Sequence, residues 1–247
     1  MKLLKKLYEK DQLGFTLTWI IAYVILMSYG DKLSAELGIR KIVTVFIGLL
    51  LSLTLFFFFK QNHLLKTYGL CKSEMHPKKM LYYIPAFIFV TVNIWFGLTL
   101  NYTPLETFIY IITMFCVGFL EEIIFRGLLF NTMKKDNLKV AILVSSLTFG
   151  VGHIVNLFNG SGAQLLSNIL QVIYATSAGF MFVMIYQKSN SLIFCIIIHA
   201  IFNSLSAFRV DYDSVVLEII IGILLALITG GYAIYLSKIE TKAKWYE

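Results

Sequence analysis

The sequence contains few charged residues and few residues that interrupt helices. Only 14% of its 247 residues are charged, and it has three prolines and three cysteines. So small a charged fraction excludes a soluble domain of ordinary composition. The cysteines, Cys71, Cys116 and Cys195, form no C-x-x-C pair, so they indicate neither a disulfide framework nor a thiolate metal site.

Apolar residues are correspondingly abundant, since 58% of the chain is hydrophobic and 15% is aromatic. A helix that crosses about 30 Å of hydrocarbon needs about 20 mostly apolar residues. Eight runs approach this length and leave no room for a soluble domain. We therefore predict an all-α, polytopic membrane helix bundle in the cell membrane, with a single domain over residues 1–247. The predicted transmembrane helices cover approximately residues 13–30, 42–59, 81–100, 105–130, 140–158, 165–187, 191–208 and 215–237.

The basic residues, which give a net charge of +7, are distributed unevenly along the chain. With eight spans, 16 of the 21 lysines and arginines fall on one side of the membrane, and only Lys32, Arg40, Lys41 and Arg209 fall on the other. Cytoplasmic loops carry an excess of such residues, so both termini are predicted to be cytoplasmic. The charge therefore reflects topology and contact with the lipid bilayer, and we predict no nucleic-acid partner.

Six polar residues interrupt the predicted spans at bilayer depth. An ionisable side chain there costs a few kcal/mol, so it is by default a candidate for function. The last four predicted spans contain no proline, which predicts continuous helices around these residues. Four of the six lie roughly 12–21 Å from the cytoplasmic ends of their spans, in one layer of the membrane. The six residues are Glu121, Glu122, Arg126, His153, His199 and Asn203.

The two adjacent glutamates are expected to differ in environment. Glu122 and Arg126 are four residues apart and share one helix face, because an α-helix turns about 100° per residue. They are predicted to form an ion pair. Glu121 then points elsewhere, with no local counter-ion, and can reach a cavity. An alternative interpretation is that Glu122 and Arg126 form a buried salt bridge that only holds the bundle together.

The same spacing places His199 and Asn203 on one helix face, and Phe149 and His153 on another. A carboxylate beside an imidazole can hold and deprotonate a water molecule, and an imidazole and an amide can stabilise the oxyanion of a peptide carbonyl. Two histidines and one glutamate also match the ligand set of catalytic zinc. The sequence thus predicts a hydrolytic water and leaves open whether a Zn²⁺ ion bound by Glu121, His153 and His199 activates it.

Three motifs together resemble a known family. The segment EEIIFRG fits E-E-x-x-x-R, FGVGH fits F-x-x-x-H, and HAIFN fits H-x-x-x-N, in the order found in the CPBP intramembrane proteases, also called the Abi or CAAX-protease family. The resemblance covers about residues 105–208, the expected catalytic core. It also implies an eight-helix membrane bundle.

The resemblance implies a role for each matching residue. Glu121 is the general base, His153 helps to hold the water, and His199 and Asn203 stabilise the oxyanion. The supporting residues are Glu122, Arg126 and Phe149. We expect the spans that carry these motifs to surround a cavity open to the cytoplasmic leaflet.

The implied activity is hydrolysis of a peptide bond in a membrane-delivered peptide or protein. Family members range from processing of prenylated CAAX proteins to peptide maturation and bacteriocin self-immunity. Lysines outnumber arginines 18 to 3, a bias that fits a low-GC bacterium and argues against a prenylated native substrate.

Other chemistries fit the sequence less well. There is no H-E-x-x-H motif, and all five aspartates fall outside the predicted spans, which excludes an intramembrane aspartate dyad. A G-x-S-G serine motif is approached only by residues 159–162, where asparagine replaces the first glycine. Two alternatives remain: a non-catalytic membrane binding or bacteriocin self-immunity protein on the same scaffold, and ion-coupled transport through glutamate and histidine relays.

Overall fold

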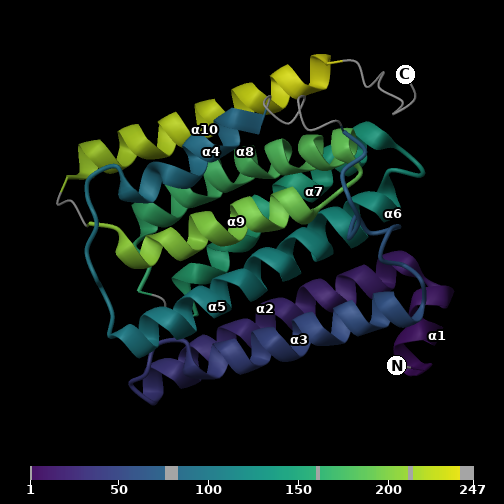
Figure 1. The fold of residues 1–247 in the computed structure, drawn as a ribbon, viewed down its shortest axis with the longest axis horizontal. Coiled ribbons are helices and arrows are strands. Elements are labelled where there is room, and N and C mark those ends of the chain that lie inside the picture. Colours follow the sequence, from purple (N-terminus) through teal and green to yellow (C-terminus); the bar gives the residue numbers. More distant parts are fainter. Residues whose placement is uncertain (1, 76–82, 160–161, 211–213, 240–247) are drawn as a thin grey trace.

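The computed structural model describes residues 2–75, 83–159, 162–210 and 214–239, and these form a helix bundle without β-strands (Figure 1). Its α-helices are α1 (Lys2–Lys10), α2 (Gln12–Glu36), α3 (Ile42–Gln61), α4 (Ile84–Thr91), α5 (Pro104–Glu121), α6 (Asn131–Met133), α7 (Leu138–Gly152), α8 (Leu165–Ser189), α9 (Ile193–Leu205) and α10 (Val215–Lys238). Other helical turns follow four of them directly: η2 (Val92–Ile94), η3 (Glu122–Phe130), η4 (His153–Leu157) and η5 (Ser206–Phe208).

The predicted all-α membrane bundle is confirmed, but the count of eight spans is not. Among the described residues, six helices are long and apolar enough to cross a membrane: Gln12–Glu36, Ile42–Gln61, Pro104–Met133, Leu138–Leu157, Leu165–Ser189 and Val215–Lys238. The predicted spans 81–100 and 191–208 appear as the shorter apolar helices Ile84–Ile94 and Ile193–Phe208. The first of these ends early because Gly97 adopts a φ of +114°, outside the helical range, and the chain pairs at Leu98 with Arg209 instead.

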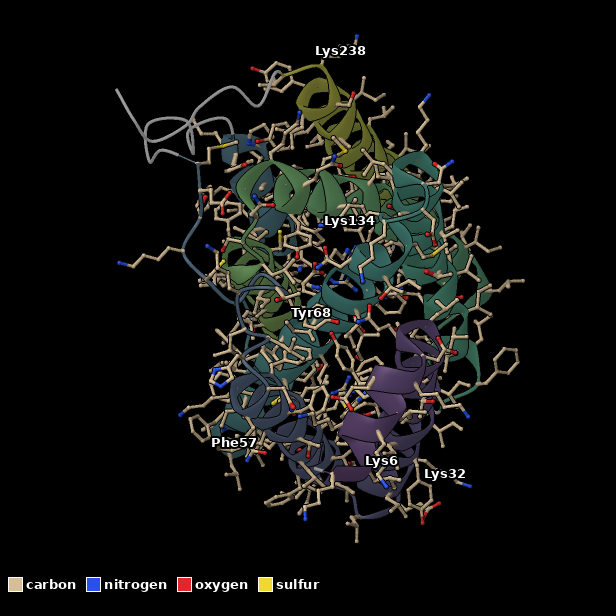
Figure 2. The ribbon with its side chains drawn as sticks, turned by 90° about the vertical axis from the view of Figure 1, so that its right-hand side faces the viewer. Lys6, Lys32, Phe57, Tyr68, Lys134 and Lys238 are labelled. Atoms are coloured by element: carbon tan, nitrogen blue, oxygen red, sulfur yellow. The ribbon has the colours of Figure 1, made fainter. Side chains whose placement is uncertain are left out.

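The helices pack in layers between two ends of the bundle. In Figure 1, α2 and α3 lie along one side, α5 and α9 cross the middle, and α10 packs with α4 and α8 on the other side. One end carries α1, α6 and the last turn of α10, and we call it the termini end. Figure 2 views the bundle from this end, with Lys6, Lys134 and Lys238 on it. Both ends of the described chain therefore lie at this end of the bundle, on opposite sides of it, whereas the side of the membrane that they face stays a prediction.

Some of the residues behind the charge-based orientation, namely Lys78, Lys79, Lys242 and Lys244, lie outside the described residues, as do parts of the 159–162 segment and two of the five aspartates.

The helix that carries the two glutamates is continuous from Pro104 to Met133, although it is not α-helical throughout. Thr103 and Glu106 form a capping box that starts it, and from Glu122 to Phe130 the backbone is π-helical. Such wider turns are frequent at functional sites. The predicted span around His153 also changes, because α7 ends at Gly152 and His153 begins a 3₁₀ turn. The absence of proline thus predicted unbroken helices correctly, but it did not reveal these local changes.

Candidate active site

A cavity of about 880 Å³ lies inside the bundle, and four predicted site residues line it. Glu121 comes from the end of α5, His153 from the start of η4, and His199 and Asn203 from α9. Phe149 of α7 also lines the cavity. The structure therefore brings the three sequence motifs to one internal space, although they are separated by up to 82 residues of chain.

Glu122 and Arg126 form the predicted ion pair, with Nη1 of the arginine 3.0 Å from Oε1 of the glutamate and both side chains fully buried. The guanidinium carbon also lies 4.0 Å from the centre of the Phe149 ring. Neither member of the pair lines the cavity. Their place is behind the cavity wall, which agrees with a supporting role.

His199 lies between both glutamates, which differs from the expectation that Glu121 points away from its neighbour. Its Nδ1 is 2.9 Å from Oε1 of Glu122, and its Nε2 is 3.5 Å from Oε2 of Glu121. The π-helical turn begins at Glu122, so the 100° separation of consecutive α-helical residues does not hold there. One imidazole is thus placed against two carboxylates.

The carboxylate of Glu121 is held on one side only. Tyr23 Oη, from α2, donates a hydrogen bond of 2.6 Å to Oε1. Oε2 has no hydrogen-bond partner among the described residues, and the 3.5 Å to the imidazole is too long for a good hydrogen bond. A buried carboxylate oxygen without a partner costs free energy, so it is placed to interact with a water molecule or a substrate.

His153 is fixed through its backbone and one ring nitrogen. Nδ1 is 3.0 Å from the carbonyl oxygen of Phe149, and the buried Asn168 donates through Nδ2 to the carbonyl oxygen of His153 at 2.8 Å. The Phe149 ring packs edge-on against both imidazoles, with centroid distances of 5.2 Å to His153 and 5.7 Å to His199. Phe149 therefore orients the two histidines in addition to covering Arg126.

The amide of Asn203 makes no hydrogen bond within the described part of the chain, and it lines the cavity one turn beyond His199. Its backbone carbonyl oxygen accepts a 2.6 Å hydrogen bond from Ser206, whose hydroxyl is 2.8 Å from that of Tyr110. The helix end is thus braced while the side-chain amide remains available to a ligand.

The zinc hypothesis does not fit the arrangement of the side chains. The residue types are those of a zinc site, but no group of three or more His, Cys, Asp or Glu side chains in the described ranges is placed to hold a metal ion. Of Glu121, His153 and His199, only the first and last form a close pair, at 3.5 Å. Zinc ligands need to lie about 2.0–2.2 Å from one point. We therefore derive no step through a metal.

The cavity reaches the end of the bundle opposite to the termini end. Asp31 and Lys41, at the connection of α2 and α3, line it together with Glu218 in the first turn of α10. The sequence predicted both cytoplasmic termini and a cavity that opens to the cytoplasmic leaflet, and with the cavity at this end the two predictions do not agree with each other.

Tyr23 is a site residue that sequence reasoning missed. The one signal for it is position, since it lies in the middle of α2 and not at a helix end, where membrane tyrosines usually gather. Its partner Glu121 is 98 residues away, so no local pattern connects the two.

The family comparison covers the part of the chain that holds the three motifs. Residues 103–205 match the family model described as type II CAAX prenyl endopeptidase, Rce1-like. This segment is similar to the Rce1-like family. The resemblance to CAAX proteases is thereby confirmed, and this Rce1-like segment overlaps residues 105–208, whose role as the catalytic core stays a prediction.

The Rce1-like segment spans 103 of the 247 residues and contains all motif residues, whereas Tyr23 and helices α1 to α4 precede it. No curated protein and no solved structure matches the chain. This match, together with six long apolar helices among the described residues, indicates a multi-pass membrane protein.

Proposed function

We propose that the chain is an intramembrane endopeptidase that hydrolyses a peptide bond in a membrane-delivered peptide or protein. The observation that supports this most directly is the unpartnered Oε2 of Glu121, which faces His199 across 3.5 Å inside a cavity. The endopeptidase description of the matching family points to the same chemistry. No observation favours a purely binding role.

The charges of the cluster suit a site that is shielded from water. The proposed chemistry takes Glu121 and Glu122 as carboxylates and His199 as doubly protonated, and with Arg126 the four charges then sum to zero. Buried charges are tolerated only when paired in this way. In that state Nδ1 of His199 donates to Glu122, and Nε2 presents a second N–H at the cavity.

The proposed reaction starts with a water molecule hydrogen-bonded to Glu121 and His153. Glu121 takes a proton from the water as its oxygen attacks the peptide carbonyl carbon, which forms a C–O bond. The carbonyl oxygen becomes an oxyanion, to which Nε2–H of His199 and the amide of Asn203 donate. The C–N bond then breaks, and the proton on Glu121 passes to the leaving amine.

Tyr23 acts as a positioning residue for the base. Tyr23→Phe removes the 2.6 Å hydrogen bond to Glu121, and a bond to a charged group contributes about 1.5–3 kcal/mol. We expect turnover to fall about tenfold or more, with KM changed less than kcat, because 1.4 kcal/mol corresponds to a factor of ten. Tyr29→Phe, at an exposed tyrosine of the same helix, is the matched control. Equal rates for the two variants would exclude this role for Tyr23.

The proposed activity is tested by comparing peptides and membrane proteins from cells with the wild-type chain and cells with Glu121→Ala. We expect at least one membrane-associated polypeptide to accumulate uncleaved with the variant, and its cleavage products to appear only with the wild type. Quantitative mass spectrometry measures both. Identical profiles in the two strains, at equal protein levels, would contradict an endopeptidase.

We expect purified, fully active protein to contain well below one metal ion per chain, because Glu121, His153 and His199 are not gathered around one point. Elemental analysis measures the metal content. Cleavage after treatment with a strong chelator measures whether activity depends on a metal. Stoichiometric zinc, whose removal abolishes cleavage and whose return restores it, would show that the three side chains move together to bind the ion.

A further inference from the structure

We infer that the termini end of the bundle binds the headgroups of anionic phospholipids, through helix α1 and a ring of lysines. We call these lysines the lysine ring, and its members are Lys10, Lys60, Lys134, Lys139, Lys188 and Lys238. None of them lines the cavity, so the inference does not depend on the proposed function.

The lysine ring marks one surface of the membrane. Each of the six candidate spans has a lysine within two residues of its bound at the termini end. At the opposite end, only the span that begins at Ile42 has a lysine or arginine so close to its bound. A lysine at the end of a span can lay its apolar stem along lipid while its ammonium group stays at the interface. The ring therefore places six ammonium groups at the level of the lipid headgroups.

Helix dipoles explain only part of this distribution. Lysine is favoured in the last turn of a helix, where it offsets the negative end of the macrodipole. Lys60, Lys188 and Lys238 occupy such turns. Lys2 begins α1 and Lys139 lies in the first turn of α7, where the positive end of the dipole disfavours a cation. Because these two lysines also lie at the termini end, the membrane surface accounts for the distribution better than the helix direction does.

Helix α1 adds exposed lysines beside the ring. Its inner face packs on the core of the bundle through Leu4, Leu7 and Tyr8. The Tyr8 hydroxyl accepts a 2.8 Å hydrogen bond from Tyr68, and its ring lies edge-on to Phe15 with centroids 5.5 Å apart. These contacts hold the helix on the bundle, so its outer face is free to meet lipid (Figure 2). The exposed residues of that face include Lys2, Leu3, Lys5, Lys6 and Lys10.

The two ends of the bundle differ in net charge. The connection after α3 belongs to the termini end, because the backbone N–H of Glu74 donates to the carbonyl oxygen of Ser189 at 2.9 Å. Among the described residues this end holds 12 lysines and four carboxylates, a net charge of +8, whereas the opposite end holds four basic and four acidic residues. The 12 lysines are Lys2, Lys5, Lys6, Lys10, Lys60, Lys66, Lys72, Lys134, Lys135, Lys139, Lys188 and Lys238. The carboxylates beside them are Glu9, Asp11, Glu74 and Asp136.

This positive charge is not neutralised within the described part of the chain. Lys5 is the one lysine of the termini end that forms an ion pair there, at 3.7 Å from the exposed Glu9. At the opposite end, in contrast, Asp31 holds Lys41 at 2.8 Å. Each lysine near an anionic membrane surface strengthens binding to that surface about fivefold. The unpaired lysines therefore fit a lipid surface of negative charge.

Native mass spectrometry in a neutral detergent measures the lipid preference. We expect phosphatidylglycerol to bind the purified full chain at least about tenfold more tightly than phosphatidylcholine with the same acyl chains. The difference should shrink as the salt concentration rises from about 0.1 M to about 1 M, because the Debye length falls from about 10 Å to about 3 Å. Equal affinities for the two lipids would overturn the inference.

Matched lysine variants locate the binding surface. Lys139→Gln should weaken the binding of phosphatidylglycerol about fivefold, and Lys5→Gln combined with Lys6→Gln should weaken it about tenfold or more. Lys32→Gln, at an exposed lysine near the opposite end of α2, is the control and should bind the lipid as the wild type does. Glutamine and lysine have similar helix propensities, so the helices are preserved. Equal losses for Lys139→Gln and Lys32→Gln, or wild-type binding by the α1 variant, would contradict the proposed surface.

Competing anions test whether the partner is a lipid. Inorganic phosphate and a DNA duplex, each at the same phosphate concentration as the lipid, should leave phosphatidylglycerol bound. The reason is that neither offers acyl chains to exposed apolar residues beside the lysines, such as Leu3 and Leu138. Displacement by the duplex would assign the surface to nucleic acid, and displacement by phosphate would assign it to small anions. Either result would overturn the inference.

Discussion

Glu121→Gln is expected to lower turnover by at least ~10²-fold, the contribution that a general base typically makes. Glutamine has the same shape and can still accept the hydrogen bond from Tyr23, but it cannot take a proton from water. The helix bundle should therefore keep its stability. Initial cleavage rates of a substrate identified by mass spectrometry, and thermal unfolding in detergent, measure the two effects.

Glu9→Gln is the matched control for this variant, because Glu9 is an exposed glutamate of α1 that lies outside the cavity. Its ion pair with Lys5 is exposed, so its loss should change the stability little. The control should cleave at the wild-type rate. Normal turnover by Glu121→Gln would show that another group activates the water.

Glu122→Gln is expected to destabilise the folded chain by about 3–5 kcal/mol, the cost of leaving one member of a buried ion pair without its partner. Arg126 is fully buried, and Glu122 is the carboxylate bonded to it. Activity should fall too, because Glu122 also holds Nδ1 of His199. Thermal unfolding in detergent and the yield of folded protein measure the loss.

The double variant Glu122→Gln with Arg126→Met separates the effect of the unpaired Arg126 charge from the effect of losing the contact between Glu122 and His199. It removes the unpaired guanidinium, and replacing both members of a buried pair is often neutral. We therefore expect it to regain stability but not activity, since His199 still lacks its charged partner. Equal stability losses for Glu121→Gln and Glu122→Gln would contradict the distinct roles of the two glutamates.

Local patterns in the sequence predicted much of this protein. Apolar runs placed the six long helices within a few residues of their observed bounds, because hydrophobic length alone decides which segments can cross a bilayer. The spacing of Glu122 and Arg126 predicted their ion pair, since residues four apart meet on a helix. The motifs also marked five side chains that line the cavity, namely Glu121, Phe149, His153, His199 and Asn203.

Only the tertiary structure decided how those side chains meet. The contact of His199 with both glutamates depends on a π-helical turn and on the packing of α5 against α9, neither of which leaves a local signal. Tyr23 reaches Glu121 from another helix, and the cavity is lined by residues of helices that are far apart in the sequence. Composition and residue spacing predict structure within one helix. The contacts of His199 and Tyr23 form between helices, where side-chain shape and packing select one arrangement among many that the same sequence pattern allows.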